Sequence, residues 1–218
     1  KTSFLRYTSS EVFEAKFILS DILSPVESIG NFNEIKQLNS FKPLNYYAKS
    51  KLILDKFLFE NIKKKIPIIS LRYFNVYGKN ECHKLEMASP IYSFFQQIKK
   101  NGTCKIFGNF DGYKKGEHSR DFVYVKDCTS INLWAMKIKN CYPKILNVGS
   151  GDTNNFNFVA ETIINYLNYG KIEYIKFPNK LKKGYQSKTK ANIKSLRNLG
   201  YKNFFFPLRD GIKDFINE

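Results

Sequence analysis

The sequence predicts an α/β fold built around a parallel sheet, and two features carry this prediction. Residues 66–74, IPIISLRYF, form an almost continuous apolar run of β-branched and aromatic side chains, which is typical of a strand buried on both faces. Strand and helix patterns alternate around this run, as they do where helices connect parallel strands. The chain has 218 residues, of which 43% are hydrophobic and 16% aromatic, so it can bury a large core.

The first elements lie before this run. We expect a strand at residues 2–7, followed by a polar cluster that contains Ser9, and then an insertion-like, irregular stretch at residues 14–40. A helix is predicted over residues 44–63, because apolar residues recur there at helical spacing. Pro43 suits the start of that helix, since its missing N–H would be unpaired there anyway.

The later elements continue the alternation of helices and strands. The loops between them include the polar segments at residues 112–119 and 179–184. We expect helices at residues 87–100, 127–137 and 158–167 and after residues 190 and 207, and strands at residues 122–125, 145–148 and 172–177.

One glycine-containing segment partly matches the sequence pattern of a dinucleotide-binding turn. The segment NVGSGDTN follows an expected strand and precedes an expected helix, and it contains Gly149 and Gly151. Asn154 stands where the third glycine of the fingerprint would be, and that glycine allows the helix and strand to pack closely. We therefore interpret the segment as a structural tight turn and not as a pyrophosphate site.

The net charge of +17 does not point to a specific nucleic-acid partner. Only five of the 36 basic residues are Arg, whereas nucleic-acid sites favour Arg for bidentate contacts. The lysines are spread along the chain and accompany many Asn, Ile, Phe and Tyr residues, so we attribute the charge mainly to biased genome composition.

The cysteines and the hydropathy pattern predict a cytoplasmic protein without a metal centre. The four cysteines are scattered without a CxxC motif, and only two histidines could join them as ligands, so no zinc site is expected. Reduced thiols are the default for such a pattern. No apolar run approaches the ~18 residues of a membrane span, and we expect no signal peptide.

Polar residues are expected to converge at one edge of the sheet. Ligands of open parallel sheets bind beyond the carboxyl ends of the strands, where Ser9 and Asn75 would lie. Tyr47 and Lys51, four residues apart, share one face of the intervening helix. An ammonium stabilises a nearby phenolate, so Tyr47 could act as a base and the serine could orient a substrate oxygen. The motif alone also allows a surface tyrosine beside a lysine.

The order of these motifs resembles a known family. Ser9, the YxxxK pattern of Tyr47 and Lys51, and LRYFNVYG at residues 71–78 resemble the extended short-chain dehydrogenase/reductase family, which acts on nucleotide sugars with a bound nicotinamide dinucleotide. The resemblance implies a partial Rossmann-like, doubly wound parallel sheet with a smaller α/β substrate-binding region. Residues 1–78 and 121–148 would form the first part, and residues 79–120 and 149–218 the second.

Further motifs narrow the resemblance to the ADP-heptose epimerases within this family. The resemblance implies inversion at C6 of ADP-D-glycero-D-manno-heptose by transient oxidation with NADP, in the synthesis of lipopolysaccharide core precursors. It also implies a homo-oligomer, which is a pentamer in the resembled group. The motifs are KPLN at 42–45, HK at 83–84, MAS at 87–89, RDFVYVKD at 120–127, NLW at 132–134, IEYIKFPNKLK at 172–182 and GYQ at 184–186.

The resemblance assigns catalytic and cofactor roles residue by residue. Tyr47 and Lys84 would be the two acid/bases, working on opposite faces of the sugar, while Ser9 supports the sugar oxygen. Lys51 would bind the cofactor ribose and tune Tyr47. Val76 would lie near the nicotinamide, and Lys84 would also contact the cofactor.

Substrate contacts are implied for three residues, Asn75, Arg120 and Tyr185, and the fork of donors on Arg120 suits a diphosphate. The Gly-rich turn of the resembled family is not present, so we expect the chain to be the C-terminal part of something longer and inactive alone. Three alternatives remain: another nucleotide-sugar epimerase or dehydratase, an inactive truncated remnant, and an inactive basic domain that binds nucleic acid or a partner.

Overall fold

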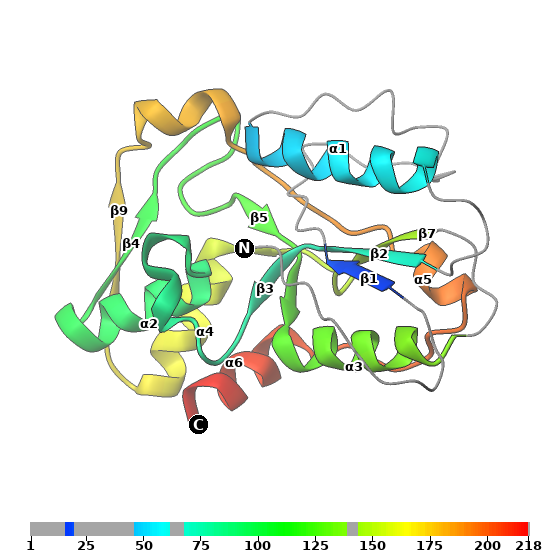
Figure 1. The fold of residues 1–218 in the computed structure, drawn as a ribbon. Helices are drawn as coiled ribbons and strands as arrows, with labels where there is room; N and C mark the ends of the chain where they lie inside the picture. Colours follow the sequence, from blue (N-terminus) through cyan, green and yellow to red (C-terminus); the bar gives the residue numbers. More distant parts are fainter. Residues whose placement is uncertain (1–15, 20–45, 62–67, 139–143, 218) are drawn as a thin grey trace.

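A three-stranded parallel sheet forms one part of the fold (Figure 1). Its order is β1 (Lys16–Leu19), β2 (Ile68–Tyr73) and β7 (Lys144–Val148), and Leu71 lies opposite both Leu19 and Leu146. All six residues of β2 are buried, which confirms the strand predicted within residues 66–74. The computed structural model describes residues 16–19, 46–61, 68–138 and 144–217.

The edge strand β1 was not predicted from the sequence. The strand expected at residues 2–7 and Ser9 lie outside the described residues. β1 instead falls inside the stretch at residues 14–40, which we expected to be irregular, and it pairs in parallel with β2. Its sequence, KFIL, is too short to show a period, so only the pairing with β2 identifies it as a strand.

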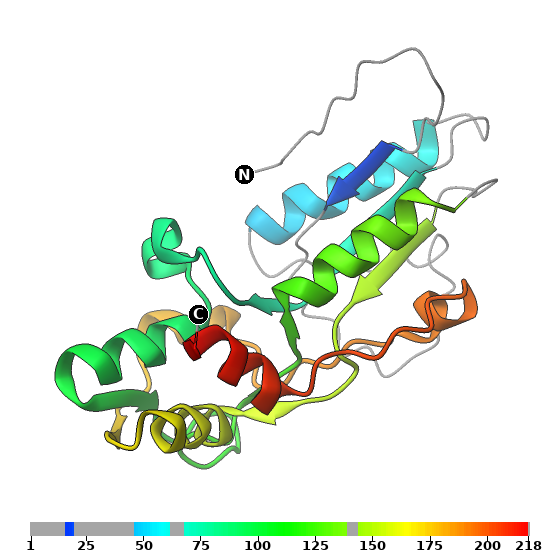
Figure 2. The ribbon, with the colours of Figure 1, turned by 90° about the horizontal axis from the view of Figure 1, so that it is seen from below.

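Helices cover both faces of this sheet. α1 (Tyr46–Asn61) and α3 (Val125–Met136) lie on opposite faces, as the two views show (Figures 1 and 2). The short helix α5 (Lys194–Asn198) contacts β7. This arrangement confirms the predicted α/β class and the doubly wound, Rossmann-like sheet. The buried core of this part consists of Ile69, Leu71, Tyr73, Val123, Cys128, Ile131, Ala135, Leu146, Val148, Leu196 and Tyr201.

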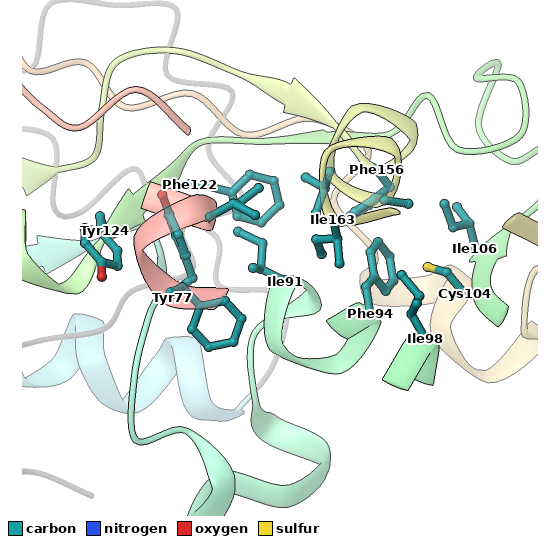
Figure 3. Close-up of a cluster of buried hydrophobic side chains, with 14 residues drawn as sticks. Tyr77, Ile91, Phe94, Ile98, Cys104, Ile106, Phe122, Tyr124, Phe156 and Ile163 are labelled. Atoms are coloured by element: carbon teal, nitrogen blue, oxygen red, sulfur yellow. The ribbon is translucent and has the colours of Figure 1, made fainter. Parts of the chain in front are cut away.

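A second group of elements surrounds another parallel pair, β4 (Thr103–Phe107) and β9 (Lys171–Ile175). The helices α2 (Pro90–Asn101) and α4 (Phe156–Leu167) pack on these strands and on each other, and α6 (Leu208–Asn217) contacts α4. Their shared core runs from Tyr77 and Tyr124 at one end to Cys104 and Ile106 at the other (Figure 3).

Two short parallel strands join the two cores. β3 (Asn75–Tyr77) follows β2 after one residue and pairs with β6 (Phe122–Tyr124). Successive side chains of a strand point to opposite faces, so Val123 packs in the core of the large sheet while Phe122 and Tyr124 pack in the second core. A further antiparallel pair, β5 (Ser119–Arg120) with β8 (Asn154–Asn155), adjoins this junction.

Local sequence explains where the helices of the second group begin and end. The Ser89 hydroxyl accepts from the Tyr92 amide at 3.1 Å, and Pro90 occupies the first turn, so α2 begins three residues after the predicted start at residue 87. Gly102 ends α2 in the left-handed conformation, with φ 64°. Among the described helices, none has the length and apolar character needed to cross a membrane.

Candidate active site

The helix that carries the YxxxK motif is anchored to the sheet by a buried charge. Asp55 on α1 accepts from Ser70 Oγ at 2.9 Å and from Arg72 Nε and Nη2 at 3.0 and 2.7 Å. Lys51 lies one turn earlier and is only 8% exposed. Tyr47 lies one turn earlier again, in the first turn of α1, so it shares a helix face with Lys51 as predicted. The Tyr47 side chain lies outside the described part of the structure.

Asn75 and Val76 follow β2 at the carboxyl edge of the sheet. The Asn75 side-chain amide donates to the Asp121 carbonyl at 3.1 Å and to Thr189 Oγ1 at 3.3 Å. Val76 is half-buried and packs against the core of the large sheet. Asn75 is therefore tied to two chain segments that lie far from it in sequence.

Arg120 and Tyr185 form the adjacent part of the site. The buried Arg120 guanidinium donates to the Ser119 carbonyl at 2.9 Å, and its Cζ lies 4.9 Å from the Tyr185 ring centroid and 5.5 Å from that of Phe156. Burial lowers the pKa of Arg120 and raises the pKa of Tyr185, and the interaction between the two opposes both shifts. Arg120 and Tyr185 are thus in contact, and Asn75 is bonded to the backbone of the residue that follows Arg120.

Asp121, next to Arg120, organises this junction. Its buried carboxylate accepts from the Ser150 amide at 2.7 Å and hydroxyl at 2.8 Å, and from the Gly151 and Ala191 amides at 2.9 Å. Burial raises the pKa of Asp121 to about 6, although these donors oppose the shift. A Cβ on Gly149 would lie 2.5 Å from the Ala191 Cβ. The turn therefore uses its amides and its glycine internally, which confirms the structural interpretation of this segment.

Lys84 lies on the 3₁₀ segment Cys82–Met87, between β3 and α2. Its Nζ is 3.5 Å from Glu81 Oε2, and its side chain is 38% exposed. Ser9 lies outside the described residues, so the predicted catalytic set is only partly described.

Sequence reasoning gave no role to the acidic residues that hold the site together. Asp55 and Asp121 are fully buried and Glu81 nearly so. Two signals were available: Arg72 stands inside the apolar run, where a buried arginine requires an acidic partner, and Asp121 belongs to the RDFVYVKD motif. Glu81 gave no comparable signal.

His118 is a further buried polar residue that the sequence did not single out. It lies in the segment expected to be a loop, and its Nε2 is 3.0 Å from the Phe110 carbonyl. Its ring centroid lies 5.3 Å from that of Tyr113, 5.2 Å from Tyr185 and 5.8 Å from Phe177. Nδ1 has no hydrogen-bond partner within the described part of the chain. Burial lowers the pKa of this histidine below 6.5.

This environment predicts a pH-dependent stability. Between pH 6.5 and the lower folded pKa of His118, the unfolded chain binds a proton that the folded chain does not, so stability present above pH 6.5 is lost as the pH falls. We expect the melting temperature, followed by circular dichroism, to fall more (or rise less) from pH 7.5 to 5.5 in the wild-type chain than in His118→Phe. Asp121, whose pKa is raised to about 6, has the opposite dependence but is present in both chains. Replacing the exposed His83 with Gln should leave the wild-type dependence unchanged. An equal slope in the His118 variant would contradict the assignment.

The fold and these motifs define the class of protein. Residues 10–149 match the NAD dependent epimerase/dehydratase family, and the chain belongs to that family. Among curated proteins, the chain is 38% identical over 180 residues to the ADP-L-glycero-D-manno-heptose-6-epimerase of Alkalilimnicola ehrlichii. That similarity covers 81% of this chain and 55% of the relative, so the chain spans about half the relative's length.

Solved structures give the same result. The ADP-L-glycero-D-manno-heptose-6-epimerase of Helicobacter pylori matches with a TM-score of 0.75 and 26% identity, over 93% of this chain and 58% of that chain. A UDP-N-acetylglucosamine 4-epimerase from Methanobrevibacter ruminantium, in complex with UDP-N-acetylmuramic acid, matches with a TM-score of 0.73 and 22% identity, over 94% of this chain and 62% of that chain. The second likeness shows the fold alone.

Proposed function

We propose that the chain is part of an enzyme that converts ADP-D-glycero-D-manno-heptose to ADP-L-glycero-D-manno-heptose for lipopolysaccharide core precursors. The observation that carries this proposal is the 38% identity over 180 residues to an ADP-heptose epimerase. Two contacts are compatible with it: Arg120 lies against Tyr185, and Asn75 is bonded to the backbone of Asp121, the residue after Arg120. We propose that these three residues contact the substrate.

By resemblance, Lys51 and Val76 are assigned to one side of a nicotinamide cofactor. Lys51 is buried on α1, one turn from the anchored Asp55, and we propose that it binds the cofactor ribose. Val76 offers a half-buried apolar contact for the nicotinamide ring. The turn at Gly149 and Gly151 does not supply a pyrophosphate site, since its amides donate to Asp121. When bound, the cofactor supplies the hydride acceptor and donor. The choice of NADP rests on the family resemblance.

Proton transfer and substrate binding are assigned to this chain's own side chains. Tyr47 and Lys84 would move the proton of the C6 hydroxyl, one for each epimer, so that hydride can leave one face of the carbon and return to the other. Ser9 would orient the sugar oxygen. The diphosphate would lie against the Arg120 guanidinium, whose planar fork of donors matches it.

The same resemblance suggests which ranges of the chain bind the cofactor and which bind the substrate. We propose that residues 1–78 and 121–148 belong to the cofactor-binding part and residues 79–120 and 149–218 to the substrate-binding part. We further propose that the complete enzyme is a cytoplasmic homo-oligomer.

The test supplies the chain with a complementary segment that carries a Gly-rich turn, together with NADP+ and the D-epimer, and follows the L-epimer. The chain alone should not turn over, because the nicotinamide must be held about 3–3.5 Å from the reacting carbon. In the complemented enzyme, Tyr47→Phe and Lys84→Ala should each slow epimerisation by about 10²- to 10⁴-fold. Tyr46→Phe is the matched control, since Tyr46 is the adjacent and exposed tyrosine.

Three outcomes would each contradict part of the proposal. Turnover by the chain alone would contradict the need for a complementary segment. Undiminished activity in both the Tyr47 and Lys84 variants would remove them as acid/bases. Conversion of UDP- or dTDP-hexoses in place of ADP-heptose would assign the chain to another nucleotide-sugar epimerase or dehydratase.

A further inference from the structure

The carboxylate of Glu81 is buried on a surface segment, with only 2% of the residue exposed. Oε1 accepts from the Gly78 amide at 3.1 Å and from the Ser89 hydroxyl at 2.8 Å. Oε2 accepts from the Ser89 amide at 2.7 Å and lies 3.5 Å from Lys84 Nζ. Burial of a carboxylate is costly unless hydrogen-bond donors replace the water molecules that it loses. Here those donors belong to Gly78, Ser89 and Lys84.

These contacts link the two residues that flank residues 79–88. Gly78 directly follows β3 and Ser89 caps α2, so the Glu81 side chain connects the end of a strand to the start of a helix. Within residues 79–88, the Lys84 backbone amide donates to the Glu81 carbonyl at 2.9 Å. Both the backbone and the side chain of Lys84 are therefore held by the same residue.

The residue after Lys84 shows that this geometry is strained. Leu85 has φ 50° and ψ −122°, an unusual conformation for a residue other than glycine, and its side chain is 80% exposed. Such strain persists only where surrounding contacts impose it. The exposed Leu85 side chain gains no burial in return, so its own packing does not account for this conformation.

Helix capping does not explain Glu81. Ser89 already caps α2 through its hydroxyl, and Pro90 preorganises the first turn. A buried charge is also weak evidence for stability, because an apolar side chain of similar volume often stabilises as well. A purely structural role of the Glu81 carboxylate would not need its contact with Lys84.

We propose that Glu81 is a positioning residue for Lys84, holding the lysine and its strained segment in the one arrangement that presents the ammonium to substrate. The inference rests on the proposed function only in giving Lys84 the role of acid/base. Glu81 acts through Lys84, so its loss should affect the step that Lys84 performs and leave the step of Tyr47 intact.

The first experiment uses the chain itself and needs no activity. Lysines are dimethylated with ¹³C, and the Lys84 signal is assigned with Lys84→Arg. In Glu81→Gln this signal should move to the position of freely mobile lysines. Ser89→Ala is the matched control, because it removes the α2 cap and one bond to Glu81 but keeps the contact with Lys84. An unmoved Lys84 signal in Glu81→Gln, or an equal movement in Ser89→Ala, would overturn the proposal.

A second variant guards against misfolding. Glu81→Asp keeps the charge but shortens the side chain by one methylene. A shorter carboxylate that still accepts from Gly78 and Ser89 should no longer reach Lys84, so the Lys84 signal should move in this variant too. Circular dichroism and the core methyl signals show whether each variant is folded.

The second experiment separates the two half-reactions in the complemented enzyme. Reduction of NADP+ is measured in a single turnover with each epimer. Lys84→Ala identifies the epimer that depends on Lys84, and Glu81→Gln should slow the same half-reaction by about 10- to 100-fold while the other changes little. Equal losses with both epimers, or a loss confined to the other epimer, would reject the positioning role. If the wild type does not epimerise, the proposed function fails and the lysine signals alone decide the inference.

Discussion

Replacing Asp55 with alanine is expected to destabilise the fold by about 3–5 kcal/mol, because the Arg72 guanidinium would stay buried without this carboxylate. Both side chains are almost fully buried, 5% and 0% exposed, with Nη2 and Oδ2 2.7 Å apart. Ser70 would lose the same acceptor. The measurement is urea unfolding followed by the fluorescence of Trp134, and the midpoint should fall with little change in slope.

Two variants show whether the cost comes from the buried charge. Glu161→Ala removes an exposed carboxylate from α4 and should change stability by less than about 0.5 kcal/mol. Asp55→Leu combined with Arg72→Met replaces the pair with apolar side chains and should recover most of the loss. A single Asp55 variant that unfolds at the wild-type midpoint would contradict the anchoring role.

Asp121→Ala should have an effect of similar size and a different local signature. It would leave the amides of Ser150, Gly151 and Ala191 without their acceptor; the Ala191 amide is buried and the other two are partly buried. A buried donor left unsatisfied costs about 1–3 kcal/mol and a partly buried one less, so we expect a total loss of about 3 kcal/mol. Amide hydrogen exchange measured by NMR should show these three amides protected in the wild type and exchanging rapidly in the variant.

The control for this prediction lies in the same turn. Asp152 is exposed, and its carboxylate accepts only from the adjacent Thr153 amide among the bonds described, at 2.8 Å. Asp152→Ala should therefore leave the Ser150 and Gly151 amides protected. Protection that survives in Asp121→Ala would show that other contacts hold the turn.

The sequence by itself determined the class of fold and the order of most elements. Apolar side chains occupy the buried faces of helices and strands, so their spacing along the chain predicts these elements. This holds for the apolar run that contains β2 and for the patterns of α1, α2, α3 and α4. The missing third glycine in NVGSGDTN also predicted a structural turn correctly, because glycine positions reflect local backbone geometry. The order of the motifs was enough to predict the family.

The tertiary structure decided which distant segments meet. β1, β3, β4, β5 and β8 were not predicted. Whether such a short segment becomes a strand depends largely on the partner strand and the packing that the fold supplies. Asp121 contacts Ala191, 70 positions away, and Asn75 contacts Thr189, 114 positions away. No local pattern records such a pair, since the hydrogen bond forms only after the chain has folded. The side chains that catalysis would use were visible in the sequence, but the buried carboxylates that hold several of them in place became visible only in three dimensions.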